Sequence, residues 1–466
     1  MHRSEMFLVF MCTYLINAIV INGASEDENF LSNINRDTSN VSMLNDAFET
    51  CFNDNANGES LSDDTNDHSR SLIRGSHKFS LELLKFLSNF ESKDSSEGLL
   101  ISPFSVWSAL IATYMGSRGD TEREIKQVLQ IEDIPKPAVG MSYQGLQLWY
   151  QIKKNASTSN NKKYSYAAAN RIFVNEKMKL NECIRDHFAN EIVSLDFSDG
   201  SAAAANINNW VADLTMGKIK ELVSANSLSP WTQIVIANAV YFKSQWLYKF
   251  DEAKNERKDF QVTPTETIQL SFMSQTGNFM YGVNERLRAT IVDLPYANQQ
   301  FSMTIILPDH TRGLDSLIKM IKPDDLYDIF GNVFDDEVYV SIPRFKTEQE
   351  FELAGPLYSM GVKKLFDPRY ADLTGFFDTP SNKSASNDSA LSQRGATINS
   401  VIHKASITVN EEGTEAAAAT AFLMARSGRP AFPTRFVADR PFMYMIRDTN
   451  TNIILFIGAV RRPNQS

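Results

Sequence analysis

The chain has 466 residues, 43% of them hydrophobic and 22% charged, which is ordinary for a globular protein of one large domain or two to three average ones. Its formal net charge of −10 is concentrated between Glu26 and Arg70, where 11 acidic residues and 2 arginines sum to −9 and leave about −1 for the rest. Because phosphate binding needs clustered Lys and Arg, this distribution excludes nucleic acid as a main partner.

The N-terminal part predicts a secreted protein. A short basic start, an apolar run over residues 6–20 and small residues at 23–25 are typical of a signal peptide spanning 1–24. The run is shorter than the about 20 residues that a membrane-spanning helix needs, and no second long apolar segment follows, so we predict no membrane contact. The acidic segment 25–75, rich in Asn, Asp and Ser, is predicted to be a mostly disordered extension.

Cysteines and glycosylation motifs agree with secretion but support it only weakly. Of the three cysteines, Cys12 lies in the signal peptide, so the mature chain keeps Cys51 and Cys183. These two can form one disulfide, although a single pair is not a disulfide framework. The short motifs for N-glycosylation also occur by chance. They begin at Asn40, Asn155, Asn382, Asn387 and Asn464.

The hydrophobic pattern is continuous from about residue 76 to 463 and predicts an α+β fold with large antiparallel or mixed sheets. Helix-like spacing near 3.6 comes first. It occurs in 77–90, 104–116, 121–131, 141–154 and 203–222. Strand-like runs rich in Val, Ile, Phe and Tyr come later. They occur in 233–242, 288–296, 301–309, 337–345, 404–410, 441–448 and 453–460. The polar stretch 379–397 is predicted to be a surface loop insertion.

The search for enzyme motifs predicts neither a catalytic residue nor a cofactor or metal. There is no Gly-x-Ser-x-Gly elbow, no Gly-rich phosphate loop and no His-Glu-x-x-His pair, and the histidines lack metal-ligand spacing. A fold can still assemble a Ser, a His and an acid from distant positions. Four lysines could bind a polyanionic glycan. A basic turn exposed to solvent is the better explanation, because few aromatic or arginine residues accompany them in the sequence. They are Lys153, Lys154, Lys162 and Lys163.

The stretch 409–430, VNEEGTEAAAATAFLMARSGRP, can serve two conformations. Its Glu-Ala-Ala-Ala-Ala part favours a helix. A period-2 strand would instead carry one wholly uncharged face. That face consists of Thr414, Ala416, Ala418, Thr420, Phe422 and Met424.

The segments HKASITVNEEGTEAAAATA and ADRPFMYMIRDTNTNIILFIGAV resemble the reactive-loop hinge and the final strands of the serpins. Further blocks resemble serpin segments in family order over nearly all of residues 76–463. They include ISPFSVWSALIATYMGSRGDTEREI, NNWVADLTMGKIKELV, IANAVYFKSQW and VSIPRFKTEQEFELAGPLYSMGVKKLF. The resemblance implies three β-sheets, eight or nine helices, and an exposed reactive-centre loop, with its hinge, over 411–435 above a five-stranded central sheet.

The resemblance also assigns roles to individual residues. A polar cluster lies beneath the point where the central strands part, and it matches Ser102, Ser105, Asn238 and His403. Trp246 and Glu411 match the region where loop insertion begins. The hinge matches Glu411, Glu412, Gly413, Thr414, Glu415, Ala416, Ala417, Ala418 and Ala419. Ordinary hydrogen-bond satisfaction in a core is the alternative interpretation of these residues, and both can hold. Ser244, where serpins usually have Gly, is expected to be a tolerated surface change.

The function implied by the resemblance is inhibition of serine proteases rather than catalysis. A protease attacks the loop and forms an acyl-enzyme, and the cleaved loop then enters the central sheet as a new strand and carries the protease to the far pole. The uncharged alternate positions of 414–424 and the absence of Pro before Pro430 favour insertion. The alternative is a non-inhibitory serpin acting as carrier, chaperone or storage protein. We expect a secreted invertebrate-type monomer that acts in a clotting, melanisation or immune cascade.

The cleaved bond is left open between two positions. Counting the usual loop length from Glu411 places the specificity residue at Ser427, with cleavage before Gly428 by an elastase-like or other protease. Some serpins are cleaved one position earlier, and Arg426 would then fill a trypsin-like pocket whose buried Asp pairs with guanidinium. We favour Arg426–Ser427 on this chemistry. Arg429 is a weaker third choice because the following Pro hinders cleavage.

Overall fold

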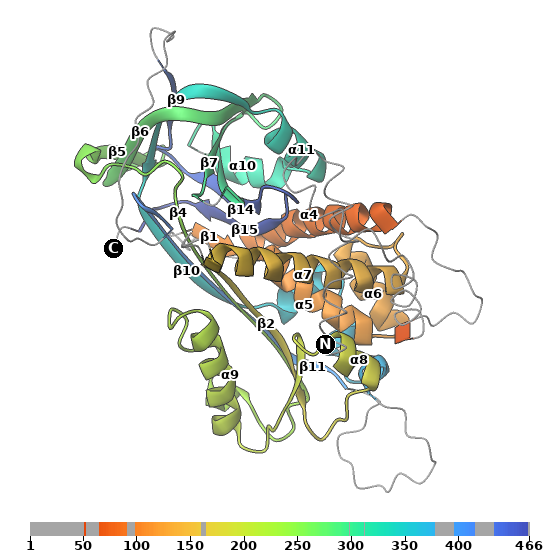
Figure 1. The fold of residues 1–466 in the computed structure, drawn as a ribbon. Coiled ribbons are helices and arrows are strands. Elements are labelled where there is room, and N and C mark those ends of the chain that lie inside the picture. The colour runs from red at the N-terminus through yellow and green to blue at the C-terminus, as the bar shows by residue number, and fades with distance from the viewer. Residues whose placement is uncertain are drawn as a thin grey trace, which may run out of the picture.

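The computed structural model describes residues 51–52, 65–90, 98–159, 165–297, 299–311, 313–377, 396–414 and 433–464. Two sheets and a group of helices form its body (Figure 1). The long six-stranded sheet carries α9 on one face and α5 and α7 on the other (Figure 1). The α+β prediction is therefore confirmed.

The structure has nine α-helices in the described ranges, and five of them overlap the five predicted helical segments. The other four are short, with six to nine residues each, and were not predicted. The segment 203–222 was predicted to be helical throughout, but the helix ends at Leu214 because Met216 and Gly217 have φ values of 53° and 72°. None of the described helices is both long and apolar enough to cross a membrane. They are α4 (Thr65–Phe90), α5 (Pro103–Gly116), α6 (Gly119–Leu129), α7 (Lys136–Ser159), α8 (Glu182–His187), α9 (Gly200–Leu214), α10 (Gly313–Met320), α11 (Pro323–Gly331) and α12 (Ala354–Met360).

The six-stranded sheet has the strand order β10, β11, β12, β4, β2, β3. Five of its strands are longer than two residues, as the resemblance implies. Strands β11 and β4 also pair directly and run parallel, whereas β4 runs antiparallel to β2. The strands are β10 (Phe345–Glu352), β11 (Ile398–Asn410), β12 (Gly413–Thr414), β4 (Ile234–Gln245), β2 (Ser165–Asn175) and β3 (Ile192–Leu195).

The second sheet has nine strands, so the described residues form two hydrogen-bonded sheets where the resemblance implies three. The 19-residue β6 pairs with β7 at its C-terminal end and with β5 and β9 over the rest, so the hydrogen-bonded ladder is unbroken. Its members are β1 (Gly98–Ile101), β5 (Glu256–Thr263), β6 (Glu266–Asn284), β7 (Ala289–Pro295), β8 (Phe301–Pro308), β9 (Phe334–Pro343), β13 (Thr434–Val437), β14 (Phe442–Asp448) and β15 (Ile454–Val460).

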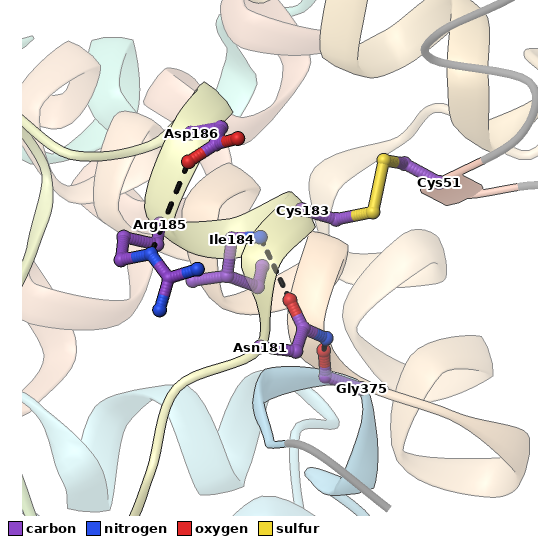
Figure 2. Close-up of a disulfide and its surroundings, with 7 residues drawn as sticks. All are labelled: Cys51, Asn181, Cys183, Ile184, Arg185, Asp186 and Gly375. Carbon is purple, nitrogen blue, oxygen red and sulfur yellow. Dashed lines mark hydrogen bonds and ion pairs between the residues drawn. A yellow bond between two sulfur atoms is a disulfide. The ribbon is translucent and has the colours of Figure 1, made fainter.

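A disulfide joins Cys51 to Cys183 in α8, and the two cysteines have a sequence separation of 132 (Figure 2). Next to it, the ring of Phe52 is 2% exposed and meets the ring of Phe188 edge-on at 6.0 Å. By the loop-closure estimate, a cross-link of this length stabilises the fold by about 5 kcal/mol. The disulfide thus fixes the part of the acidic extension around Cys51 to the body of the protein.

The extension also differs from its predicted disorder near its end, because α4 begins at Thr65 and the side chain of Leu72 is 2% exposed. Burial of this apolar side chain offsets the polar composition that surrounds it. The signal peptide, the greater part of the predicted loop insertion and three of the glycosylation motifs lie outside the described residues. Those motifs begin at Asn40, Asn382 and Asn387. The side chains of the four lysines and of Asn155 are also outside the described part, whereas Asn464 pairs with Lys346 in an isolated bridge.

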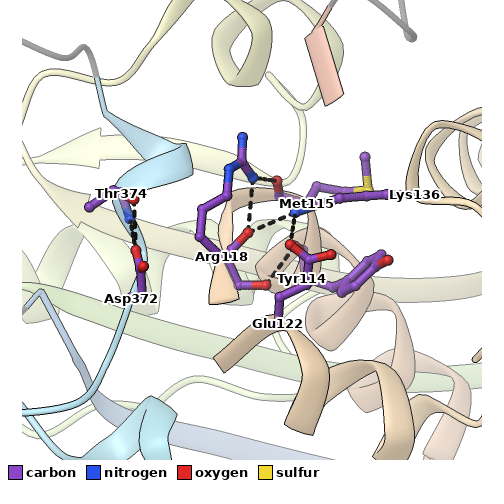
Figure 3. Close-up of polar contacts among 8 residues, drawn as sticks. Tyr114, Met115, Arg118, Glu122, Lys136, Asp372 and Thr374 are labelled. Carbon is purple, nitrogen blue, oxygen red and sulfur yellow. Dashed lines mark hydrogen bonds and ion pairs between the residues drawn. The ribbon is translucent and has the colours of Figure 1, made fainter. Parts of the chain in front are cut away.

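A group of polar contacts around Arg118, Glu122 and Lys136, here called the polar corner, connects the starts of α6 and α7 (Figure 3). The ammonium of Lys136 is 7% exposed and donates to the carbonyl of Ser117 at 2.7 Å and to Glu122 Oε2 at 2.8 Å. Arg118 links this corner to the segment around Asp372, because its backbone N–H donates to the Asp372 carbonyl at 3.0 Å. A buried ion pair with further hydrogen bonds is expensive to break. The corner therefore ties α5, α6 and the start of α7 into one block.

Candidate functional site

The two-residue strand β12 lies between β11 and β4 at one end of the six-stranded sheet. Gly413 is opposite Asn410 of β11 and Gln245 of β4, and Thr414 is opposite Val409 and Ser244. Both pairings are antiparallel. The start of the stretch that can be either helix or strand is therefore a strand here, and it has a hydrogen-bonding neighbour on each side.

Gly413 is required at this position by its backbone. Its φ is +142°, which L side chains rarely adopt, and an added Cβ would lie 2.1 Å from the carbonyl oxygen of Ser244. Ser244 itself is 1% exposed, and its hydroxyl has no hydrogen-bond partner among the described residues. The expectation that Ser244 is a surface residue was wrong, because β4 continues as an interior strand as far as Gln245.

Trp246 follows β4 and donates hydrogen bonds to the end of β11 and to the segment that connects it to β12. Its indole Nε1–H donates to the carbonyl of Asn410 at 2.9 Å, and its backbone N–H donates to the carbonyl of Glu412 at 2.9 Å. Its ring stacks on Tyr296 with the centroids 4.6 Å apart and the planes 9° apart. Trp246 therefore lies where the family resemblance places it, at the entrance of the gap between β4 and β11.

Glu411 is buried at the same entrance, with an exposed fraction of 2%. Its carboxylate accepts from Asn255 Nδ2 at 2.6 Å and lies 3.6 Å from Arg344 Nε. Sequence reasoning missed both partners, because no motif or spacing marks them. A buried carboxylate needs such partners, so the first residue of the hinge is anchored from both sides.

A buried polar cluster lies further along β4 and β11, where these two strands pair directly. His403 is opposite Asn238, and His403 Nδ1–H donates to Asn238 Oδ1 at 2.5 Å. The other ring nitrogen, Nε2, accepts from the backbone N–H of Ser102 at 3.2 Å, which assigns the proton to Nδ1. The Ser102 hydroxyl donates to Ser105 Oγ at 3.0 Å. The structure therefore brings together all four residues that the resemblance assigns to this cluster.

Asn170 of β2 extends the cluster and was not predicted. Its Oδ1 accepts from Asn238 Nδ2 at 2.8 Å, so that the network spans β11, β4 and β2. In the sequence Asn170 ends an alanine run without a distinguishing signal. Side-chain hydrogen bonds across the three strands hold the sheet closed here. The buried bond between His403 and Asn238 must be exchanged for another if β4 and β11 separate.

Burial makes His403 a pH-sensitive part of this network, since complete desolvation lowers its pKa to about 3. An unfolded His titrates at about 6.5. A folded pKa below the unfolded one means that protons bind the unfolded chain preferentially, so stability is full above pH 6.5 and is lost as the pH falls toward 3. His77, whose pKa burial lowers to about 4, acts in the same direction. Glu191, whose pKa burial raises to about 7, acts in the opposite one.

We predict that His403 alone lowers the free energy of unfolding by about 2 kcal/mol between pH 7 and pH 5. The measurement is denaturant unfolding at both pH values for the wild type and for His403→Gln. The variant should lose less stability on acidification by that difference, whatever its stability at pH 7. Equal losses in the two proteins would contradict the prediction.

The remaining predicted site residues lie outside the described part of the chain. They are Glu415, Ala416, Ala417, Ala418, Ala419, Arg426 and Ser427. The cleaved bond therefore stays a prediction. Within the described ranges, no group of three His, Cys, Asp or Glu side chains is placed to hold a metal ion.

The fold and the hinge together define a class of protein whose central sheet holds the beginning of a further strand between two of its long strands. The chain belongs to the serpin family, because the family model described as Serpin (serine protease inhibitor) matches residues 74–463. This match begins within two residues of the predicted domain start.

Relatives and solved structures agree with this family over most of the chain. Serine protease inhibitor 88Ea of Drosophila melanogaster is 32% identical over 414 residues, which cover 85% of this chain and 92% of the relative. Antitrypsin of Bombyx mori is 32% identical over 371 residues, covering 78% and 87%. Among solved structures, Serpin48 of the insect Tenebrio molitor superimposes with a TM-score of 0.68 at 30% identity, covering 84% of this chain and 98% of that one.

Proposed function

We propose that this protein is a secreted inhibitor that traps a trypsin-like serine protease as a covalent acyl complex by inserting its cleaved loop into the six-stranded sheet. The observation that carries this proposal is the place of β12, whose two residues already pair with β11 on one side and β4 on the other. A strand begun in this way can lengthen from its first residues once cleavage frees the far end of the loop.

Insertion is favourable because each entering residue gains hydrogen bonds to neighbouring strands. If about a dozen residues each gain about 1 kcal/mol net, insertion releases on the order of 10 kcal/mol before entropy costs. The side chains that would face the protein interior after insertion are small and uncharged, since residues 414, 416 and 418 are Thr, Ala and Ala. No Pro before Pro430 removes a backbone hydrogen-bond donor. This free energy is available to distort a protease that is bound through its active-site serine.

The trypsin-like target is supported by Arg426, whose guanidinium suits a pocket with a buried carboxylate. The name of the Bombyx mori relative, Antitrypsin, agrees with such a target for that protein. The predicted signal peptide and the disulfide between Cys51 and Cys183 support secretion. A clotting, melanisation or immune cascade of an invertebrate is the setting we propose, because two of the relatives that match most of the chain come from insects.

The test is incubation with trypsin, followed by denaturing electrophoresis and mass spectrometry of the released C-terminal peptide. We expect a heat- and detergent-stable complex and a peptide that begins at Ser427. Arg426→Ala should lower the rate of complex formation with trypsin about a hundredfold, because the pocket loses its ion pair. Arg429→Ala is the matched control and should behave like the wild type.

Other outcomes assign the protein differently. A peptide that begins at Gly428, together with undiminished trapping by Arg426→Ala, would move the cleaved bond to Ser427–Gly428. Cleavage by every serine protease tried, without any stable complex, would exclude the inhibitory function.

A further inference from the structure

The register of β12 determines where an inserted loop would end. Continuing its pairing without a slip places Met424 opposite Ile234, the first residue of β4, and Ala425 opposite Ile398, the first residue of β11. Arg426 then comes two residues after Met424, the last residue that both neighbours can pair. A protease linked to Arg426 would therefore lie at the end of the sheet where β4 and β11 begin.

The two strands that would receive the loop, β4 and β11, keep the same register where they pair directly and where β12 lies between them. At the closed part of the sheet His403 is opposite Asn238, and at β12 Thr414 is flanked by Val409 and Ser244. The offset between β11 and β4 is the same in both places. Between these two levels the strands can therefore move apart sideways without sliding. A bulge between Ile398 and Ser400 changes the offset by one residue at the far end, so the two strands place the end of the paired region one residue apart.

The chain at this end of the sheet presents an exposed tryptophan on a rigid turn. Trp231 is 69% exposed, whereas the neighbouring Thr232 is 4% exposed. Ser229 N–H donates to Thr232 Oγ1 at 2.9 Å, and Thr232 N–H donates back to the Ser229 carbonyl at 2.9 Å. The Thr232 carbonyl accepts from Asn175 Nδ2 of β2 at 2.8 Å. The backbone is thus fixed on both sides of a large apolar side chain that the fold does not bury.

We infer that the turn formed by residues 229–232 is a docking surface for the trapped protease and that Trp231 is its main contact. The inference rests on the proposed function. In the extended register Arg426 is opposite Thr232, one residue from Trp231, and paired strands lie about 4.8 Å apart. The surface around the protease's active-site serine must then lie within reach of the indole. Large, rigid aromatic side chains are the residues that contribute most to such contacts.

This contact stabilises the displaced position of the protease. A protease whose active site is distorted by the pull of the inserted strand regains activity when it can relax, and hydrolysis of the acyl bond then releases it. Burial of the indole against the protease opposes that relaxation. Trp231 therefore acts after insertion, on the lifetime of the complex, and not on recognition or cleavage of the loop.

The experiment measures how fast purified complexes with trypsin release active enzyme. Trp231→Ala should form complexes at the wild-type rate and stoichiometry but release trypsin about ten times faster. Its melting temperature before cleavage should equal that of the wild type, because the side chain is exposed. Phe334→Ala is the matched control, since Phe334 is 71% exposed and lies on β9 of the other sheet, and its complexes should keep the wild-type lifetime.

The outcomes separate this inference from the proposed function. Complexes of Trp231→Ala with an unchanged lifetime would overturn the docking surface and leave inhibition intact. An equal shortening in Phe334→Ala would also overturn it, because the effect would not be specific to this end of the sheet. Absence of stable complexes from the wild type would overturn the proposed function itself.

Discussion

Replacing Thr414 by Arg is expected to convert the protein from an inhibitor into a substrate. The backbone of Thr414 lies between Val409 of β11 and Ser244 of β4, at the point from which a longer strand must grow. On the inward face of that strand a guanidinium would be buried without a partner, which costs several kcal/mol. A barrier higher by about 3 kcal/mol slows insertion more than a hundredfold, so the protease completes hydrolysis before it is displaced.

The measurement is the number of inhibitor molecules consumed for each trypsin molecule inactivated, which should rise from about one to more than ten in Thr414→Arg. Ala417→Arg is the matched control, because alternation along a strand turns position 417 to the opposite face. It should keep a value near that of the wild type. Stable one-to-one complexes formed by Thr414→Arg would refute the insertion mechanism.

Cleavage in the loop is expected to raise the melting temperature strongly. If the inserted strand contributes about 10 kcal/mol, and the matched domain of about 390 residues unfolds with an entropy of roughly 0.8 kcal/mol/K, the midpoint rises by about 12 °C. The gain comes from ladder bonds along β4 and β11, which in the uncleaved protein pair directly only as far as Ser406 and Tyr241.

Calorimetry before and after limited proteolysis would measure this rise, with mass spectrometry to verify that only the loop is cut. The Thr414→Arg variant, cleaved in the same way, is the control and should show a much smaller increase. A melting temperature that stays the same after verified cleavage of the wild type would favour a carrier or storage role.

The sequence predicted those elements best whose side chains are apolar along their whole length. Strands β8, β14 and β15 are buried at every position, and their predicted ranges agree with the structure to within one residue at either end. The hydrophobic pattern alone missed strands of mixed polarity. Strand β5, which reads ERKDFQVT, exposes one face to solvent, and β6 changes partner along its 19 residues. Period-2 alternation is weak in such strands.

For the site, resemblance identified the residues that carry its chemistry but not all of their partners. Asn170, Asn255 and Arg344 complete the networks around Asn238 and Glu411, and each lies more than 60 residues from the side chain that it contacts. Asn and Arg occur at many surface positions, so residue type alone does not reveal which of them contact a buried side chain. Their roles depend on which strands and loops the fold brings side by side.

By itself, the sequence determined that alternate positions from Thr414 to Met424 are uncharged and that no proline precedes Pro430, and therefore that the stretch 409–430 is compatible with a strand as well as with a helix. Only the tertiary structure decided between the two at Gly413 and Thr414. Helix propensity is a local property worth fractions of a kcal/mol per residue. The strand is stabilised by hydrogen bonds to β4 and β11, whose facing residues at Thr414 are Ser244 and Val409. Because β4 is distant in the chain, no local pattern in the hinge could reveal that pairing.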